Sequence, residues 1–452
     1  MRRLAAALCL LIATPASADT LIDNVTGLTL DEDGNVQTFN ALLIDDAGTI
    51  AKVFKRKDKR PKKVDYRLDG KGRVLLPGLI DSHVHVMKLG LARLKAEAGF
   101  KGTPKGDPRP EDRDLAFAKA QEALLASGIT TVADIGTTIE DWQSYRRAGD
   151  RGALRIRLVA YAHGTANMVL IGGPGPTPWL YDGKLQQVGL ALTLDGPIET
   201  RRAWLKAPYA DAPDTSGTPR LSETSLRNQM SRAAIDGFQV AVIARGDAAN
   251  AAALDAIDEL GETYAGDRRW RIEGTNVLDP TDAARFAALG ATASMQPGRL
   301  GIESAIGATL LGETRLADVQ RWRSLSDAGT PLVFGSGSRA ETPQPFAAMA
   351  LAMTRRPSAD LPFDGWQPQE RLPRETAFAA FTATAAHALF AEKQIGRIAK
   401  GLHADFLFVD RDPLLVSPDE LGKTRVLETW IGGVRVYSAK GAARSAASDE
   451  GR

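Results

Sequence analysis

The sequence is poor in cysteine and in histidine. Its 452 residues include one cysteine, Cys9, and five histidines. A single cysteine excludes an intramolecular disulfide, a cysteine-rich zinc ribbon and a CxxC redox pair. The histidines stand at positions 83, 85, 163, 387 and 403, and so small a number sets a low upper limit on any histidine-based metal centre.

Long hydrophobic runs and an excess of either charge are also missing. Beyond the N-terminus no segment reaches the length of about 18 apolar residues typical of a membrane span. The 57 basic residues nearly balance the 55 acidic ones, so net charge gives no reason to expect nucleic acid as a partner. Hydrophobic residues make up 44% of the chain, which excludes a disordered or collagen-like protein.

The N-terminus has the pattern of a secretory signal peptide. Two arginines precede an apolar stretch, Leu4–Ala13, and an Ala-Ser-Ala triplet ending at Ala18 forms a small-residue cleavage site. We therefore predict that residues 1–18 are removed and that the mature chain is periplasmic or secreted. Cys9 would be lost with this segment. A buried N-terminal helix is the alternative interpretation.

One dense run of basic residues, KRKDKRPKK, occupies positions 55–63. It contains no aromatic residue, and short strand-like segments flank it on both sides. A binding patch for a polyanion is one interpretation of such a run. A solvated hairpin loop is the interpretation that the pattern favours.

The distribution of apolar residues indicates two kinds of structure. Residues 20–75 read as short strands separated by turns. From residue 74 onward, short apolar runs are followed in several cases by segments with a helical period. Eight such runs occur: Val74–Ile80, Thr130–Ala133, Ile156–Tyr161, Val188–Leu194, Phe238–Ala244, Trp270–Glu273, Ala291–Met295 and Pro331–Phe334. The helical segments are 112–127, 222–236, 248–260, 280–289, 317–328 and 374–390.

This alternation predicts an α/β protein containing a (β/α)8 TIM barrel, because strands buried on both faces are typical of parallel sheets. Strand-like segments return after Gly396, and neither terminal group of strands is large enough to bury a core alone. The predicted organisation is therefore a barrel over residues 77–395 and a small composite β-sandwich over residues 19–76 and 396–440. The small, polar tail at 441–452 is predicted to be disordered.

The most specific motif is LLPGLIDSHVHV at 75–86. Residues two apart on a strand share one face, so His83 and His85 would point together from the end of the first barrel strand. Neutral imidazoles that converge in this way are typical ligands of a divalent metal. The strand is followed by ASGITTVADIG at 126–136, which continues the same pattern.

In this context the chain resembles the amidohydrolase superfamily of metal-dependent hydrolases. The resemblance covers nearly the whole mature chain and is greatest to the branch of imidazolonepropionase-like and N-substituted formamide deformylase-like proteins, the amidohydrolase 3 branch. The phrases GFQVAVIARGD (237–247), PLVFGSGS (331–338) and GRIAKGLHADFLFVDRDPL (396–414) also match this branch. The resemblance implies hydrolysis of non-peptide carbon–nitrogen bonds, with zinc or another divalent metal as the cofactor.

Four further metal-site positions of the family carry residues that neither bind metal nor transfer protons. Ala191 stands where the resemblance implies a bridging lysine, and Ile243 where it implies a histidine. Gly274 takes the place of a second histidine. Gly337 takes the place of the aspartate that accepts a proton from the attacking water. We therefore predict that the metal binds weakly or not at all and that hydrolysis is weak or absent, as in a pseudoenzyme.

Two other functions stay open. The first is an active mononuclear hydrolase that uses His83, His85 and a substitute ligand such as His163. The acids available near strand ends to complete such a site are Asp134, Asp195, Asp247 and Glu273. The second is a non-catalytic binding or assembly protein. His387 and His403 are predicted to be structural.

The substitutions also predict the character of the barrel mouth. Three of the four replacing residues are small, so the mouth would be wider and less polar than in the family and would suit a small, partly apolar ligand. Collapse of neighbouring side chains into the space is the alternative. The sequence leaves the oligomeric state open, with a homo-oligomer as one possibility.

Overall fold

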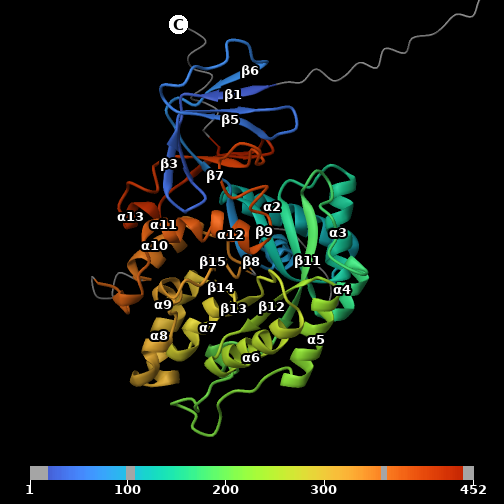
Figure 1. Cartoon of the computed structure of the whole chain (residues 1–452), viewed down its shortest axis with the longest axis vertical. Helices are drawn as coiled ribbons and strands as arrows, with labels where there is room; N and C mark the ends of the chain where they lie inside the picture. Colours follow the sequence, from blue (N-terminus) through green and yellow to red (C-terminus); the bar gives the residue numbers. More distant parts are fainter. Residues whose placement is uncertain (1–18, 98–106, 339, 358–363, 441–452) are drawn as a thin grey trace, which may run out of the picture.

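The computed structural model describes residues 19–97, 107–338, 340–357 and 364–440. The predicted signal peptide and the predicted disordered tail lie outside these ranges. The described residues form one eight-stranded sheet and two smaller sheets of four and six strands. Figure 1 shows the smaller sheets at the top of the molecule and the eight-stranded sheet with its helices below them.

The eight strands of the large sheet run parallel and follow one another in chain order from β8 to β15. They are β8 (Leu79–Val84), β9 (Ile129–Thr137), β10 (Arg157–His163), β11 (Leu185–Thr193), β12 (Gln239–Ala244), β13 (Arg271–Gly274), β14 (Thr292–Met295) and β15 (Leu332–Phe334). Nearly all their residues are buried, as the apolar runs predict. The predicted α/β barrel is confirmed.

Helices surround this sheet and cover its outer face (Figure 1). They are α1 (Val86–Ala96), α2 (Pro110–Ala126), α3 (Ile139–Asp150), α4 (Gly164–Gly172), α5 (Glu223–Ile235), α6 (Asp247–Thr263), α7 (Ala283–Ala288), α8 (Leu300–Leu311), α9 (Trp322–Asp327), α10 (Pro345–Thr354), α11 (Arg374–Ala379), α12 (Ala383–Ala388) and α13 (Pro418–Leu421). The sequence analysis does not predict α1, α3, α4, α8, α10 or α13. Of these, α4, α8 and α10 are largely apolar, so no polar face marks their period.

The helix predicted over 374–390 is broken at its centre, and the break closes the barrel. The carbonyl of Ala380 accepts a hydrogen bond from the backbone N–H of Phe334 in β15 at 3.0 Å. The next carbonyl, that of Phe381, accepts one from Ile80 in β8 at 2.8 Å. These two bonds bridge the first and last strands, and they interrupt the helix because both carbonyls leave its internal ladder.

The first predicted apolar run, Val74–Ile80, also divides. Its first half forms β7 (Val74–Pro77) in a small sheet, and its second half begins β8 in the barrel. Gly78 lies between them, and a Cβ atom there would stand 2.2 Å from the Thr130 hydroxyl. This close approach requires a glycine. The chain passes from the small sheet to the barrel at this residue.

The two smaller sheets pack face to face as a sandwich. The four-stranded sheet has the order β5-β4-β1-β6 and the six-stranded sheet the order β18-β17-β16-β7-β2-β3. Their strands are β1 (Thr20–Asp23), β2 (Thr26–Leu30), β3 (Val36–Phe39), β4 (Ala41–Ile44), β5 (Ile50–Phe54), β6 (Tyr66–Asp69), β7, β16 (Phe406–Val409), β17 (Val426–Ile431) and β18 (Val434–Ser438). Buried residues of both sheets share one hydrophobic cluster, which includes Ile22, Leu42, Leu75 and Phe406. The predicted sandwich built from both chain ends is confirmed.

A buried ion pair joins the sandwich to the barrel. Arg157, at the start of β10, donates to both carboxylate oxygens of Asp405, at 2.6 and 2.9 Å. Asp405 precedes β16 and also accepts the backbone N–H of Gly432 at 2.8 Å. Within the described ranges, no helix has the length and apolarity needed to cross a membrane.

Candidate active site at the barrel mouth

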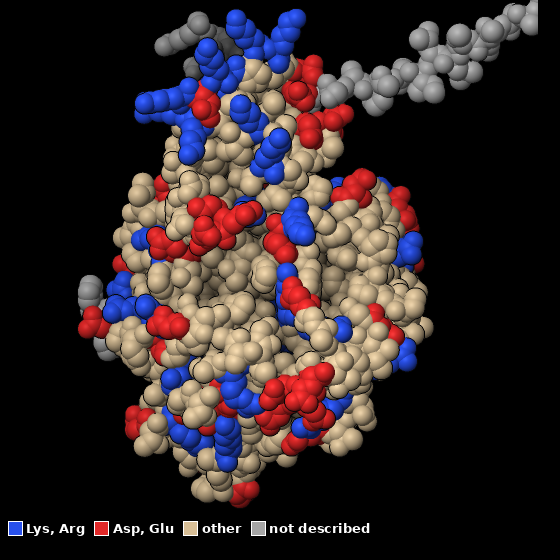
Figure 2. Space-filling model, viewed as in Figure 1, with Lys and Arg blue, Asp and Glu red and all other residues tan. Residues whose placement is uncertain are grey.

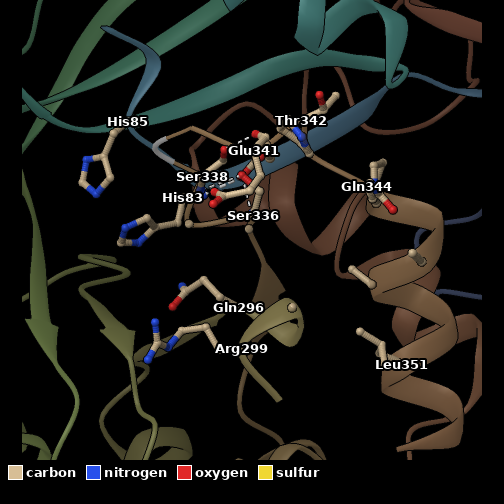
Figure 3. Close-up of a pocket in the computed structure, with 18 of the residues that line it drawn as sticks. His83, His85, Gln296, Arg299, Ser336, Ser338, Glu341, Thr342, Gln344 and Leu351 are labelled. Atoms are coloured by element: carbon tan, nitrogen blue, oxygen red, sulfur yellow. Dashed lines mark hydrogen bonds between the residues drawn. The ribbon is translucent and has the colours of Figure 1, made fainter. Parts of the chain in front are cut away.

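The carboxyl ends of the barrel strands open into a cavity of about 650 Å³. One wall is polar, and Figure 3 shows its main side chains, which are His83, His85, Gln296, Arg299, Ser336, Ser338 and Glu341. The opposite wall is apolar and comes from α8 and α10, with Ile302, Ala347, Ala348 and Leu351. The cavity therefore suits a small molecule with one polar and one apolar side.

His83 and His85 lie side by side at the end of β8, as the motif predicts. Their ring centroids are 5.3 Å apart and the rings are nearly perpendicular. The backbone N–H of His85 donates to Ser338 at 3.1 Å, and the His83 carbonyl accepts from Gly337 at 2.8 Å. The segment that follows β15 therefore holds the histidine pair in place.

Each histidine uses Nδ1 in a short hydrogen bond. His83 donates from Nδ1 to the Glu273 carboxylate at 2.7 Å, and His85 donates from Nδ1 to the Ile135 carbonyl at 2.7 Å. Both acceptors are oxygen atoms without a proton, so Nδ1 must carry the hydrogen in both rings. The tautomer of each neutral ring then has its lone pair on Nε2, as in metal-bound histidines.

A fully buried arginine lies beside this pair, inside the barrel. Arg271 Nε donates to the second oxygen of Glu273 at 2.8 Å, and both residues are completely inaccessible to solvent. Burial alone would raise the pKa of Glu273. The charge of Arg271 and the hydrogen bond from His83 outweigh that effect and hold the pKa of Glu273 below its usual value. Glu273 is therefore a carboxylate shared between a guanidinium and an imidazole.

Other interior groups use the remaining hydrogen-bond donors of Arg271. Its two terminal nitrogens donate to the Tyr161 hydroxyl at 3.1 Å and to the Ser82 carbonyl at 2.6 Å. The guanidinium carbon lies 5.0 Å from the centre of the Tyr161 ring, within range of a cation–π interaction. Tyr161 in turn donates to Gln239 at 2.5 Å. The barrel interior therefore contains a fixed positive charge that is hydrogen-bonded through all three of its nitrogens.

Two of the four positions at which the resemblance implies metal-site residues belong to the apolar interior. Ala191 on β11 and Ile243 on β12 are buried and pack in one cluster with Ile135, Val159 and Tyr161. Neither side chain has a polar atom that it could present to the barrel mouth. The space that longer polar side chains would need is filled by hydrocarbon.

The other two substituted positions are glycines with backbone conformations that disfavour side chains. Gly274 has a φ of 107° and Gly337 a φ of 60°. A Cβ at 274 would stand 3.1 Å from Arg245 Cγ, and a Cβ at 337 would stand 3.1 Å from Gln296 Cγ. Neighbouring side chains therefore already occupy the space next to both positions.

Asp81 is a buried carboxyl group in the wall of the cavity. One of its oxygens accepts the backbone N–H groups of His83 at 3.1 Å and Ser336 at 2.9 Å. Its other oxygen is buried and, within the described chain, has no hydrogen-bond partner. Burial raises the pKa of Asp81 to about 6, although both hydrogen bonds act in the opposite direction.

Asp195, a candidate from the sequence, holds loops instead of facing the cavity. It accepts the backbone N–H groups of Trp204, Arg245 and Gly246 at 3.0, 2.9 and 2.8 Å. Burial raises the pKa of Asp195 to about 6. Asp247 likewise accepts the backbone N–H of Lys206 at 2.9 Å.

Of the remaining histidines, His163 lies at the carboxyl end of a barrel strand, and the other two lie elsewhere in the fold. His163 is the last residue of β10 and is exposed. His387 is on α12, where its ring nitrogen is 3.9 Å from Glu392, and it lines a separate groove with Lys393 and Lys400. Burial lowers the pKa of His403, which precedes β16. Neither His387 nor His403 lines the barrel cavity.

The donor set does not fit the metal centre that the resemblance implies. Among the residues that the structure describes, no three His, Cys, Asp or Glu side chains form a group able to hold a metal ion. His83 and His85 supply two nitrogens, and the nearby carboxylate of Glu273 is already neutralised by Arg271. A catalytic site typically needs three protein ligands.

Sequence analysis missed Arg271. A signal was present, because Arg271 and Glu273 are two residues apart on a predicted strand and so share a face. Since Glu273 was already a candidate for the barrel mouth, the arginine two residues earlier could have been placed in the interior. Its hydrogen bonds to Ser82 and Tyr161 depend on the closed barrel and have no sequence signal.

Comparison with known proteins places these features in context. The family model described as "Amidohydrolase family" matches residues 96–437. The Arabidopsis thaliana protein LONG AFTER FAR-RED 3 is 30% identical over an alignment of 348 residues, which covers 72% of this chain and 58% of that protein. The putative amidohydrolase YtcJ of Bacillus subtilis (strain 168) is 29% identical over 54% of this chain and 46% of its own length.

A third relative is the N-substituted formamide deformylase of Arthrobacter pascens, which is 25% identical over 70% of this chain and 59% of its own length. The chain thus spans about half to three fifths of the length of these curated relatives. Among solved structures, a metal-dependent hydrolase from Pyrococcus horikoshii OT3 superposes with a TM-score of 0.76 at 21% identity. That match covers 89% of this chain and 99% of the other, and it supports the fold.

Proposed function

The chain belongs to the amidohydrolase family, and from this premise we propose that its barrel mouth binds a small molecule while the family's metal-assisted hydrolysis is weak or lost. Four family positions carry Ala191, Ile243, Gly274 and Gly337. The proposal also includes export, for which the signal-peptide pattern of residues 1–18 is the support.

The observation that carries the proposal is the buried Arg271–Glu273–His83 network. Arg271 is permanently charged and fully inaccessible, and it stands next to the carboxylate that His83 binds. A second cation bound at the histidine pair would be repelled by Arg271 in the low-dielectric interior. Glu273 would not compensate its charge, because Arg271 already neutralises that carboxylate. The network therefore favours a barrel interior stabilised by an arginine.

The proton-transfer part of the family chemistry is also weakened. Hydrolysis of this type needs a base positioned to accept a proton from water. Gly337 stands where the resemblance implies an aspartate, and the side chain of Gln296 fills the adjacent space. An amide does not accept a proton at neutral pH, so Gln296 cannot act as that base.

One set of observations favours the rival function, an active mononuclear hydrolase. The Nδ1 hydrogen bonds of His83 and His85 give both rings the tautomer of metal ligands. One buried oxygen of Asp81 has no partner within the described residues and lines the same cavity. The rival predicts turnover that depends on His83, and the proposal predicts binding without turnover.

Ligand binding and turnover can be measured on the same samples. We expect amides, lactones or hydantoins with an apolar substituent to raise the melting temperature of the full chain. Ala348→Phe projects a ring into the apolar wall and is expected to abolish the shift. Leu170→Phe, at an exposed position on α4 outside the cavity, is the matched control and should keep it.

Hydrolysis products are quantified in parallel for the wild type, His83→Ala and His163→Ala. The proposal predicts no turnover beyond the buffer rate in any of the three. Turnover lost in His83→Ala but retained in His163→Ala would overturn it in favour of a two-histidine hydrolase. Turnover lost in both variants would favour His163 as the substitute ligand, and no melting shift from any compound would contradict the binding function.

A further inference from the structure

A dense group of basic side chains stands at the outer end of the sandwich. Residues 55–63, which we call the basic loop, connect β5 to β6, the two edge strands of the four-stranded sheet. Figure 2 shows Lys and Arg side chains crowded at this end of the molecule, with the barrel below. None of these residues lines the barrel cavity, so any role of the loop is separate from the site described above.

The loop has a defined shape because two arginines hold it. Arg60 donates to the backbone carbonyls of Lys55 and Asp58 at 3.0 and 2.7 Å and to the carboxylate of Asp23 at 3.0 Å. Arg67 donates to the Pro61 carbonyl at 3.1 Å and to the other oxygen of Asp23 at 3.0 Å. These bonds fix the loop backbone against β1 and β6.

The one acid of the loop is also used in this framework. Asp58 accepts the backbone N–H of Lys55 at 2.7 Å, and its own N–H donates to the Lys55 carbonyl at 3.0 Å. The framework therefore leaves the other cations of the loop facing solvent. Within the described chain, these cations are exposed and form no ion pair: Lys55, Arg56, Lys57, Lys59, Lys62 and Lys63.

The chain enters the sandwich directly beside this loop. The backbone N–H of Asp19 donates to Asp65 at 3.0 Å, and the Tyr66 N–H donates to the Asp19 carbonyl at 3.1 Å. Tyr66 itself is 65% exposed, and tyrosine is a typical residue of the membrane–water interface.

We propose that the basic loop docks this end of the sandwich onto a membrane surface rich in anionic phospholipid. The exposed cations supply the complementary charge, since each Lys or Arg near such a surface adds to the attraction. Nucleic acid fits less well, because residues 55–63 contain no aromatic side chain on which a base could stack.

Vesicle binding of the full chain tests this proposal. Co-sedimentation is measured with phosphatidylcholine vesicles and with vesicles that contain about one third phosphatidylglycerol. We expect tighter binding to the anionic vesicles, weakened by salt because the Debye length falls from about 10 Å at 0.1 M to about 3 Å at 1 M. The comparison of the two vesicle types cancels any contribution to binding that does not depend on lipid charge.

Two variants with four substitutions each separate the effect of the loop from the effect of net charge on vesicle binding. Changing Lys57, Lys59, Lys62 and Lys63 to Gln is expected to weaken binding to anionic vesicles at least tenfold. The control changes four exposed lysines elsewhere to Gln and should bind like the wild type. The control lysines are Lys95, Lys393, Lys400 and Lys423.

Each of the other outcomes overturns the proposal. Equal loss in both variants would show that only net charge matters. Equal binding to anionic and neutral vesicles would show that the charge of the loop plays no part in attachment. Tighter binding to duplex DNA than to anionic vesicles, lost in the loop variant, would assign the loop to nucleic acid.

Discussion

At the scale of single residues, the interior of this barrel depends on charge compensation. Arg271 and Glu273 are both fully buried, and each would be an unpaired charge without the other. His83 adds a hydrogen bond to the same carboxylate at 2.7 Å. The stability of the barrel interior and the orientation of His83 are therefore coupled through Glu273.

Glu273→Gln is expected to lower the free energy of unfolding by about 3 kcal/mol, because Arg271 is left as a buried charge without a counter-ion. Arg271→Met combined with Glu273→Gln should recover part of that loss. Urea unfolding measures both. The control is Asp327→Asn in the exposed Arg323–Asp327 pair, which should change stability by less than about 1 kcal/mol. Similar effects of Glu273→Gln and Asp327→Asn would contradict the structural role of the pair.

Gly337 allows a test of whether the position can accept the aspartate that the resemblance implies. Gly337→Asp places a side chain at a φ of 60° and against Gln296. We expect a loss of about 1–2 kcal/mol in the free energy of unfolding from backbone strain and contact. Adding Gln296→Ala should recover the contact part. A Gly337→Asp variant as stable as the wild type would show that the position is open and that the loss of the acid is a single reversible step.

At the scale of elements, a buried carboxyl connects three parts of the barrel wall. Asp134 on β9 accepts the N–H of Val86 at the start of α1 at 2.9 Å, the Thr137 hydroxyl at 2.7 Å and the hydroxyl of Tyr145 on α3 at 2.9 Å. Burial, together with the nearby charge of Asp141, raises the pKa of Asp134 to about 6. Between the unfolded pKa of 3.8 and the folded pKa of about 6, the native protein therefore keeps a proton on Asp134 that the unfolded chain has already released.

The raised pKa of Asp134 predicts how the free energy of unfolding depends on pH. Between the unfolded pKa of 3.8 and the folded value of about 6, the native state holds the extra proton, so the contribution of Asp134 to stability falls as pH rises through that window. Relative to Asp134→Asn, the wild type should lose up to about 3 kcal/mol between about pH 4 and pH 6. Unfolding at several pH values measures the difference. If the free energies of unfolding of the wild type and Asp134→Asn changed with pH in parallel, that result would contradict the raised pKa of Asp134.

Much of the element order follows from the sequence, and the exceptions have physical causes. The strands from β9 to β15 coincide with apolar runs because both of their faces are buried. The helix predicted at 374–390 follows a correct period, yet the carbonyls of Ala380 and Phe381 bond to β15 and β8 instead. A bond between segments distant in sequence can override a local preference, and a periodic pattern contains no information about it.

At the scale of the whole molecule, the two-domain architecture was predictable because each terminal group of strands is too small to bury a core alone. The connection between the domains was not. Arg157 and Asp405 are 248 residues apart in sequence, and only the folded chain brings them to 2.6 Å. The candidate site likewise has one part that the sequence predicts and one part that it does not. A local motif marks His83 and His85, whereas the interior position of Arg271 follows from barrel closure.

We propose that an arginine-stabilised interior stands in place of the metal centre that the family resemblance implies. The most direct test is the zinc content of the purified full chain after equilibration with zinc and removal of the excess, measured by mass spectrometry together with protein concentration. The account predicts far less than one equivalent, unchanged by His83→Ala or by the control His163→Ala. Close to one equivalent of zinc in the wild type, lost in His83→Ala, would contradict it.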